Sequence, residues 1–235
     1  MINIDKNLWI FNGETLNFYS FPFTTRMTIV MLSNGDLWVH SPIRLTPDLK
    51  SQVDSLGKVK YLISPNPLHH LFLKEWQKAY PDSLMYGTKQ VIKKRDDLCF
   101  DGTLDEMSNT PWEEDINQLL FTGSFAMQEC IFFHKKTNVL IVTDLIENFS
   151  PEALPFFKRQ IAKFAGVLAP NGKMPIDWCL SFYFRKKEAR KHIEKILSWK
   201  PKKIILSHGE IIQENAETFL RRSFKWVGLT KESTN

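Results

Sequence analysis

Apolar runs alternate with polar turns along the chain, and this pattern predicts a strand-rich first third. Residues 26–32 and 37–40 are apolar runs on either side of an Asn-Gly turn, which indicates a β-hairpin. Thr46, an N-cap residue placed directly before a proline, predicts a short helix that ends at Gly57. The run at 59–64 then predicts a strand.

The rest of the chain continues this mixture of elements. Further strands are expected at residues 119–122, 129–134, 139–143 and 203–206, and helices at 71–80, 151–164, 186–199 and about 213–226. Strands and helices alternate at the front and the back of the chain, with hairpins between them. The pattern therefore predicts a mixed α/β layered fold and argues against an all-β sandwich. The length of the chain suits either one large domain or two small ones.

Composition is that of a globular protein and excludes several other classes. Hydrophobic residues make up 43% of the 235 positions, enough for a sizeable core. Cys99, Cys130 and Cys179 are widely spaced, so we expect free thiols in a reducing compartment and neither a disulfide framework nor a cysteine-bound zinc. No signal-peptide pattern and no apolar run of about 18 residues is present, so we expect a cytoplasmic protein without a membrane partner.

The formal net charge is +5, and basic residues gather late in the chain, at 185–203 and 221–225. A solvated helix face accounts for such runs without any partner. Nucleic-acid binders usually carry a denser basic patch with aromatic residues between the charges. A nucleic-acid phosphoesterase or binder is therefore a minor alternative, and a nucleic-acid partner is not expected.

Metal-capable side chains stand directly after several predicted strands: His40, His69, His70, Asp144 and His208. Ligands of open α/β folds bind outside the carboxyl ends of the strands, so these side chains are expected to meet in one pocket. Imidazole and carboxylate ligands suit zinc, iron or manganese. A single strand-end His or Asp is more often a hydrogen-bonded structural residue, and it is the joint occurrence that indicates a metal site.

Four segments of the chain are similar to the family called domain of unknown function 4336. They are RMTIVMLSNGDLWVHSPI, LGKVKYLISPNPLHHLFLKEW, ECIFFHKKTNVLIVTDLIENF and ILSHGE, and the resemblance spans residues 8–210. Their order, in which a His-rich loop is followed by an Asp after a hairpin and a late Ser-His-Gly, also resembles the metallo-β-lactamase superfamily. This resemblance implies a four-layer αββα sandwich of mixed sheets, formed by residues 1–235 as a single domain.

The resemblance also implies that part of the metal centre is lost. The superfamily carries an HxHxDH loop after the strand that follows the first helix, and aligned without gaps this loop falls on residues 65–70. Pro65 and Pro67 then replace the first two histidines. His69 replaces the aspartate, and His70 is the retained histidine. The middle histidine of the superfamily has no counterpart, so the first of the two usual metal sites has lost its ligands.

For the second metal site, the resemblance implies four ligands: His69, His70, Asp144 and His208. Asp144 matches the bridging carboxylate and His208 the late histidine ligand. The set would hold one divalent metal ion, with zinc favoured over iron or manganese. If the prolines have removed the site altogether, no metal is expected.

The expected function is that of a metal-dependent hydrolase acting on a small molecule, with Asp144 orienting the attacking water or serving as base. The alternative is a non-catalytic relative that binds a small ligand without metal. Glu129 and His134 are five apart on one predicted strand, so at most one of them can face the pocket. His40 is either a further ligand or a group that orients one.

Overall fold

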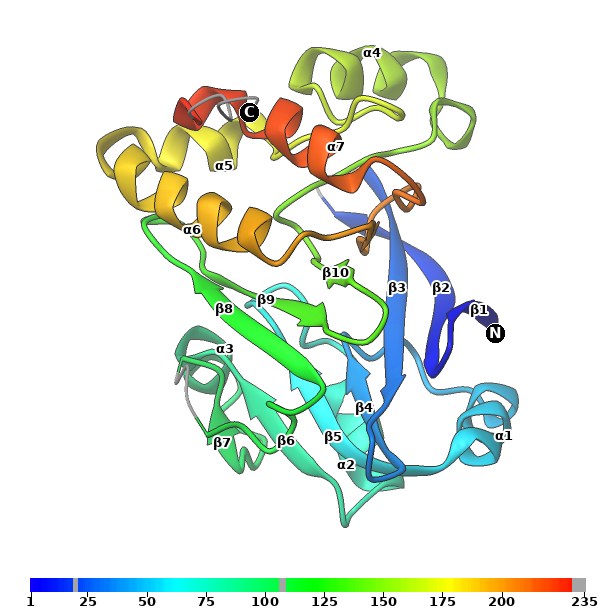
Figure 1. Ribbon diagram of the computed structural model, residues 1–235. Coiled ribbons are helices and arrows are strands. Elements are labelled where there is room, and N and C mark those ends of the chain that lie inside the picture. Colours follow the sequence, from blue (N-terminus) through cyan, green and yellow to red (C-terminus); the bar gives the residue numbers. More distant parts are fainter. Residues whose placement is uncertain (19–20, 106–108, 230–235) are drawn as a thin grey trace.

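The structure is a computed structural model, and it describes residues 1–18, 21–105 and 109–229 (Figure 1). Two β-sheets pack face to face, and helices cover the outer face of each sheet. This arrangement confirms the predicted four-layer αββα sandwich of mixed sheets.

The first sheet contains seven strands in the described part of the chain. In spatial order these are β1 (Ile2–Asp5), β2 (Leu8–Phe18), β3 (Phe21–Met31), β4 (Asp36–His40), β5 (Lys58–Ser64), β6 (Leu84–Gly87) and β7 (Gly102–Thr103). Strands β1 to β4 pair antiparallel, whereas β4 to β7 pair parallel. The parallel part of the sheet therefore directs the carboxyl ends of β4 and β5 to the same edge.

The connections of this sheet follow from local sequence. The β3–β4 hairpin turns at Gly35, whose φ of 87° is one that glycine adopts without strain. The helix α1 (Pro47–Leu56) begins at Thr46, whose side chain accepts a hydrogen bond from the backbone N–H of Leu49 at 3.2 Å. The helices α2 (Leu73–Ala79) and α3 (Lys89–Lys94) follow the next two strands and share the same outer face.

The second sheet has the strand order β11 (Lys203–Ile205), β10 (Val139–Ile141), β9 (Glu129–His134) and β8 (Ile116–Phe121) among the described residues. Strands β10 and β11 are parallel, so their carboxyl ends also share one edge. The outer layer consists of α5 (Ile176–Ser181), α6 (Lys186–Ser198) and α7 (Ala216–Ser223), with single 3-10 turns η2 (Tyr183–Arg185) and η3 (Lys225–Val227).

A further helix, α4 (Phe156–Ala165), follows the 3-10 turn η1 (Pro151–Ala153) and lies at the top of Figure 1. Its single buried residue, Ala162, belongs to a small apolar cluster with Phe149 that packs against Phe21 and Phe23 of β3. The helix is therefore attached to the tip of the β2–β3 hairpin rather than to the outer layer of the second sheet.

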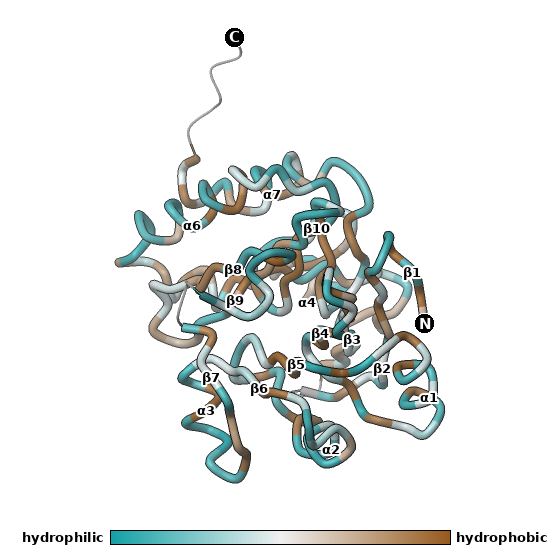
Figure 2. The backbone as a smooth tube through the Cα atoms, turned by 60° about the horizontal axis from the view of Figure 1, so that its bottom comes forward, coloured by the Kyte–Doolittle hydropathy of each residue, from teal (hydrophilic) through white to brown (hydrophobic). Residues whose placement is uncertain are grey.

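The core lies in three layers between these elements. Between the two sheets, Trp38, Trp112 and Phe132 are almost fully buried. Two further apolar clusters separate each sheet from its helices, and Figure 2 shows the apolar stretches of backbone concentrated along the strands. No described helix has the length and apolar composition that crossing a bilayer requires.

Candidate functional site

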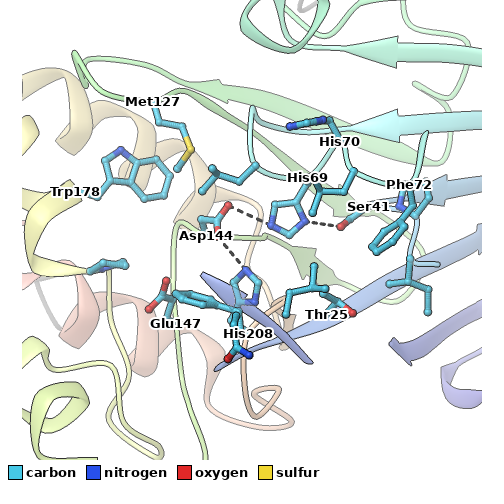
Figure 3. Close-up of a pocket in the computed structure, with 18 of the residues that line it drawn as sticks. Thr25, Ser41, His69, His70, Phe72, Met127, Asp144, Glu147, Trp178 and His208 are labelled. Carbon is cyan, nitrogen blue, oxygen red and sulfur yellow. Dashed lines mark hydrogen bonds and ion pairs between the residues drawn. The ribbon is translucent and has the colours of Figure 1, made fainter. Parts of the chain in front are cut away.

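A cavity of about 440 Å³ lies at the edge where the parallel strands end. Ser41 follows β4, the loop at residues 65–72 follows β5, Asp144 lies in the loop after β10, and His208 in the loop after β11. Residues of the β2–β3 hairpin and of α5 also line the cavity, among them Thr25 and Trp178 (Figure 3). The position agrees with the general rule that ligands bind at the carboxyl ends of strands in such folds.

Three of the predicted site residues come together at the floor of this cavity. The Nε2 atom of His69 lies 3.1 Å from Oδ2 of Asp144, and Nε2 of His208 lies 3.0 Å from Oδ1 of the same carboxylate (Figure 3). One ligand atom from each residue lies within 4.8 Å of the other two. A single carboxylate thus stands between two imidazole rings, and each ring presents the same nitrogen to it.

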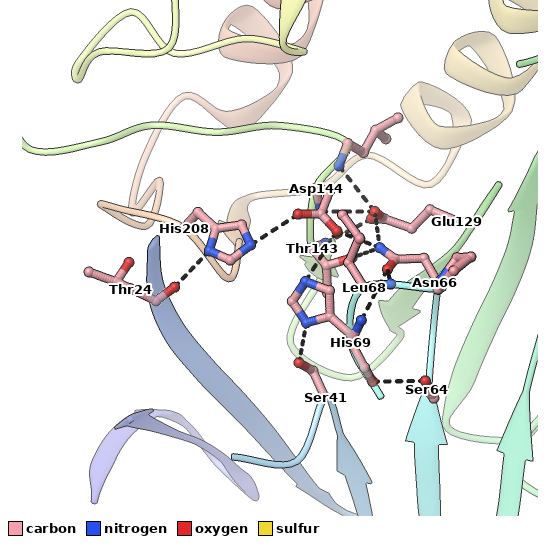
Figure 4. Close-up of polar contacts among 12 residues, drawn as sticks. Thr24, Ser41, Ser64, Asn66, Leu68, His69, Glu129, Thr143, Asp144 and His208 are labelled. Atoms are coloured by element: carbon pink, nitrogen blue, oxygen red, sulfur yellow. Dashed lines mark hydrogen bonds and ion pairs between the residues drawn. The ribbon is translucent and has the colours of Figure 1, made fainter. Parts of the chain in front are cut away.

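The far nitrogen of each ring is held by a hydrogen bond. The Nδ1 atom of His208 lies 2.6 Å from the backbone oxygen of Thr24, and that of His69 lies 2.5 Å from Oγ of Ser41 (Figure 4). Because a carbonyl oxygen can only accept, Nδ1 of His208 carries the proton. For His208 this hydrogen bond fixes the tautomer that presents Nε2 to a metal ion, and for His69 the Ser41 hydroxyl holds the ring in place. Metal-bound histidines usually have such a partner.

The electrostatics of the three side chains also favour a cation. Burial alone would raise the pKa of Asp144, but the charges and hydrogen bonds of His69 and His208 bring that pKa well below its usual range. For His208, burial lowers the pKa, but the bond to Asp144 outweighs it and the net shift is upward. The carboxylate therefore stays ionised and stabilises positive charge on its neighbours.

This donor set fits a divalent metal ion. Two imidazole nitrogens and one carboxylate oxygen form the three-ligand set of many catalytic zinc sites, which leave further positions open. The same two-histidine, one-carboxylate set also holds non-haem iron. The described residues at the floor of the cavity therefore have the chemistry to hold one divalent ion.

A buried network that the sequence analysis did not identify fixes Asp144. The carboxylate of Glu129 is fully buried and accepts backbone N–H bonds from Thr143 at 2.7 Å, Asp144 at 2.8 Å and Leu145 at 3.1 Å. Of the two polar residues on β9, Glu129 is thus the one that reaches the site. His134, at the other end of the strand, bonds through Nδ1 to Thr137 Oγ1 at 2.8 Å.

The carboxamide of Asn66 connects this network to the loop after β5. Its Nδ2 lies 2.7 Å from Asp144 Oδ2 and 3.0 Å from Glu129 Oε2, and its Oδ1 accepts from the backbone N–H of Leu68 at 2.8 Å and of His69 at 3.3 Å (Figure 4). One buried side chain therefore sets the relative position of two ligand-bearing loops. Burial, with the charge of Asp144, raises the pKa of Glu129 to about 7.

The fourth predicted ligand, His70, lines the cavity but points elsewhere. Its Nδ1 lies 3.2 Å from Nη1 of Arg95, which also donates to the backbone oxygen of His70 at 2.8 Å. Burial and the nearby positive charges of Lys94 and Arg95 lower the pKa of His70 to about 4. His70 is therefore not part of the three-residue group, and Figure 3 shows its ring turned away from Asp144.

His40 is buried between the two sheets. Its ring stacks on Trp38 at a centroid distance of 5.4 Å and meets Phe132 edge-on, and neither ring nitrogen has a hydrogen-bond partner among the described residues. Burial holds the pKa of His40 well below its usual range, so the ring is neutral. It lies outside the three-residue group at the floor of the cavity.

The walls of the cavity are largely apolar above this polar floor. Phe23, Ile43, Phe72, Met127 and Trp178 contribute side chains from five different segments. The acidic side chain of Glu147 also lines the cavity, and burial raises its pKa to about 8.

The family model described as domain of unknown function (DUF4336) matches residues 5–165, which is more than half of the chain. The chain belongs to this family. No curated protein sequence matches it significantly.

Similar solved structures support the fold. A metallo-β-lactamase from Pontibacter korlensis is 10% identical, with 97% of this chain and 98% of that chain covered and a TM-score of 0.64. The metallo-β-lactamase FIM-1 from Pseudomonas aeruginosa, in a mono-zinc form, is 9% identical, with coverages of 97% and 96% and a TM-score of 0.59.

The rubredoxin oxygen:oxidoreductase from Desulfovibrio gigas is a further similar structure. It is 11% identical, with a TM-score of 0.62, and the match covers 96% of this chain and 61% of that one. At these identities the similarities establish the metallo-β-lactamase fold and not an activity.

Proposed function

We propose that this protein is a metal-dependent hydrolase of the metallo-β-lactamase type, in which His69, Asp144 and His208 hold one divalent ion. The observation that carries the proposal is the placement of two Nε2 atoms at 3.0 and 3.1 Å from the two oxygens of one buried carboxylate. The whole chain, residues 1–235, would act as one domain. Zinc is the favoured ion, and iron or manganese suit the same donors.

A divalent ion bound here would supply Lewis acidity, which polarises an ester, amide or phosphoester and makes a water molecule more acidic. The protein supplies the rest. Asp144 orients the attacking water, because it is held ionised and its backbone is fixed by Glu129. Ser41 and the backbone oxygen of Thr24 keep the two imidazole rings in their orientation.

The substrate we propose is a small molecule whose non-reacting part is apolar. The side chains of Phe23, Ile43, Phe72, Met127 and Trp178 form the walls above the polar floor, so an apolar group gains free energy by leaving water there.

Absence of a nucleic-acid partner stays a prediction. Cytoplasmic localisation is proposed because Cys99, Cys130 and Cys179 are free thiols, which suits a reducing compartment.

The first experiment is metal analysis of untagged protein by inductively coupled plasma mass spectrometry, with His69→Ala, Asp144→Asn and His208→Ala beside the wild type. The matched control is His70→Ala, which removes a histidine next to a proposed ligand whose ring faces Arg95. We expect about one ion per chain in the wild type and in the control, and loss of the ion in the other three variants.

Two other results would change the conclusion. Loss of metal in His70→Ala as well, with the fold intact, would restore the four-ligand site expected from the sequence. A folded wild type that carries no metal, and that gains no thermal stability from added zinc, iron or manganese, would refute the hydrolase proposal and leave the ligand-binding alternative.

A further inference from the structure

The apolar side of helix α4 faces solvent. Phe157, Ile161 and Phe164 are spaced so that they lie on one side of the helix, and their exposed fractions are 80%, 62% and 86%. The neighbouring Phe156 is 64% exposed. Only Ala162 of this helix is buried, so α4 is amphipathic with its apolar stripe directed away from the protein.

A second exposed apolar group lies on α5 and the η2 turn. Leu180, Tyr183 and Phe184 have exposed fractions of 64%, 76% and 90%, whereas Phe182 between them is fully buried. Monomeric proteins rarely expose large apolar side chains in such groups unless the surface binds something. We call the two groups together the aromatic surface: Phe156, Phe157, Ile161, Phe164, Leu180, Tyr183 and Phe184.

Basic side chains accompany both halves of the aromatic surface. The sequence of α4, FFKRQIAKFA, contains three basic residues and no acidic one. Exposed Arg185, Lys186 and Lys187 follow the second group directly. Among the residues that the structure describes, only Arg185 of these three has an acidic partner, Glu188 at 3.5 Å. The surface therefore combines bulky apolar side chains with net positive charge.

Both halves of the aromatic surface adjoin the cavity. Helix α5 contributes Asp177 and Trp178 to the lining of the cavity. Helix α4 packs through Ala162 on a cluster that contacts Phe23, which is also part of that lining. The helices α4 and α5, which carry the two halves of the aromatic surface, both lie in the upper half of Figure 1.

The composition of this surface suits an anionic lipid bilayer better than another protein. Interfacial helices that lie in the plane of a membrane combine Phe and Leu on one face with Lys and Arg beside it. The cores of protein–protein interfaces, by contrast, are depleted in lysine. Anionic lipid headgroups would attract the basic residues, while the aromatic side chains would leave water at the level of the acyl chains.

We propose that the aromatic surface docks the protein peripherally on an anionic lipid bilayer. This contact needs no membrane-spanning segment, so it is compatible with the absence of an apolar run long enough to span, although the sequence analysis expected no membrane partner. It also gives the basic residues at 185–187 a role other than solvation. The inference is independent of the metal ion and can fail or succeed on its own.

The test is co-sedimentation of the full-length protein with vesicles of phosphatidylcholine alone and of phosphatidylcholine with phosphatidylserine. The wild type should bind the anionic vesicles several-fold better, and added salt should weaken the binding. Phe164→Ser should lower the partition coefficient roughly tenfold, because one buried aromatic side chain is lost. The matched control is Ile2→Ser, which removes an exposed apolar residue on β1.

The charge contribution is tested by the double variant Lys186→Glu and Lys187→Glu. Each basic residue near an anionic surface contributes about fivefold to binding, so this variant should bind anionic vesicles at least tenfold more weakly. Its matched control is Lys58→Glu with Lys136→Glu. These exposed lysines lie at the start of β5 and in the β9–β10 turn, at the edge opposite the cavity, and the control should bind like the wild type.

Three results would overturn the proposal. The first is a wild type that binds neither kind of vesicle. The second is wild-type binding by Phe164→Ser and by the double lysine variant, with their fold verified by thermal unfolding. The third is a concentration-dependent dimer that Phe164→Ser abolishes, without vesicle binding, because a second copy of the chain would then cover the aromatic surface.

Discussion

The side chain of Asn66 donates a hydrogen bond of 2.7 Å to Oδ2 of Asp144, and this bond joins the loop after β5 to the loop after β10. The two residues are 78 positions apart in the chain. The carbonyl oxygen of the same carboxamide accepts a hydrogen bond from the backbone N–H of His69. The relative position of two proposed ligands therefore depends on one buried amide.

Replacing Asn66 with alanine should destabilise the protein. The change removes the amide donor that bonds both Glu129 and Asp144. Each of these buried carboxylates then loses a hydrogen bond that offsets the cost of its burial. We expect a loss of about 1–3 kcal/mol in the free energy of unfolding, or roughly 2–10 °C in Tm. Asn117→Ala on β8, half-buried, is the control and should change stability little; equal losses would contradict a special role for Asn66.

Replacing Ser41 with alanine should weaken zinc binding without removing it. The hydroxyl holds Nδ1 of His69 at 2.5 Å, and loss of such an orienting partner lowers metal affinity about tenfold or more. The measurement is zinc affinity by chelator competition. The control is Ser83→Ala. This variant also removes a buried hydroxyl, but that hydroxyl bonds the backbone oxygen of Tyr80 and not a proposed ligand. An unchanged affinity in Ser41→Ala would show that the hydroxyl does not orient the ring.

Replacing His40 with phenylalanine should stabilise the protein and leave its metal content unchanged. The ring already sits among Trp38 and Phe132, and its two nitrogens lost their hydration without gaining partners in the described structure. We expect a gain of about 1–2 kcal/mol in the free energy of unfolding. His134→Phe, which breaks the bond to Thr137, should instead be destabilising. Loss of metal from a folded His40→Phe would mean that His40 acts at the site.

Glu147 should make the stability of the metal-free protein depend on pH. Burial, together with the charges of Asp144 and Asp177, raises the pKa of Glu147 to about 8 although His208 opposes the shift. Between its ordinary value of 4.5 and about 8, the folded state keeps a proton that the unfolded chain releases. The contribution of Glu147 to the free energy of unfolding therefore falls as pH rises through this window and is constant above it.

The variant Glu147→Gln isolates this contribution, because glutamine resembles the protonated carboxyl. Measured by thermal unfolding in the presence of a chelator, the variant should match the wild type near pH 5. It should be the more stable protein near pH 9, by up to about 5 kcal/mol. Parallel curves for the two proteins from pH 5 to pH 9 would mean that Glu147 titrates normally.

Much of the fold was predictable because its signals are local. Thr46 begins α1 through a side-chain cap that needs no tertiary contact, and the helix ends directly before Gly57, where the sequence predicted its end. The hairpin of β9 and β10 follows from two apolar runs around a short polar turn. By contrast, α3 and α5 have six residues each, too few for a helical period to stand out, and the sequence analysis did not predict them.

The candidate site was predictable in part for the same reason. The strand ends place His69, Asp144 and His208 near one another through the topology alone. The direction of the His70 ring depends on Arg95, 25 positions later, and the role of Asn66 depends on carboxylates 63 and 78 positions later. Long-range partners of this kind leave no mark in local periodicity, so the ring of His70 and the amide of Asn66 could not be placed.

Glu129 accepts three consecutive backbone N–H bonds, and none of these bonds involves a metal ion. The loop that carries Asp144 is therefore already in place before an ion arrives. Loading would then be a simple bimolecular capture, with a rate proportional to the concentration of free ion and without a preceding refolding step. If the proposed function holds, such a protein would lose its ion, remain folded and regain its activity when the ion returns.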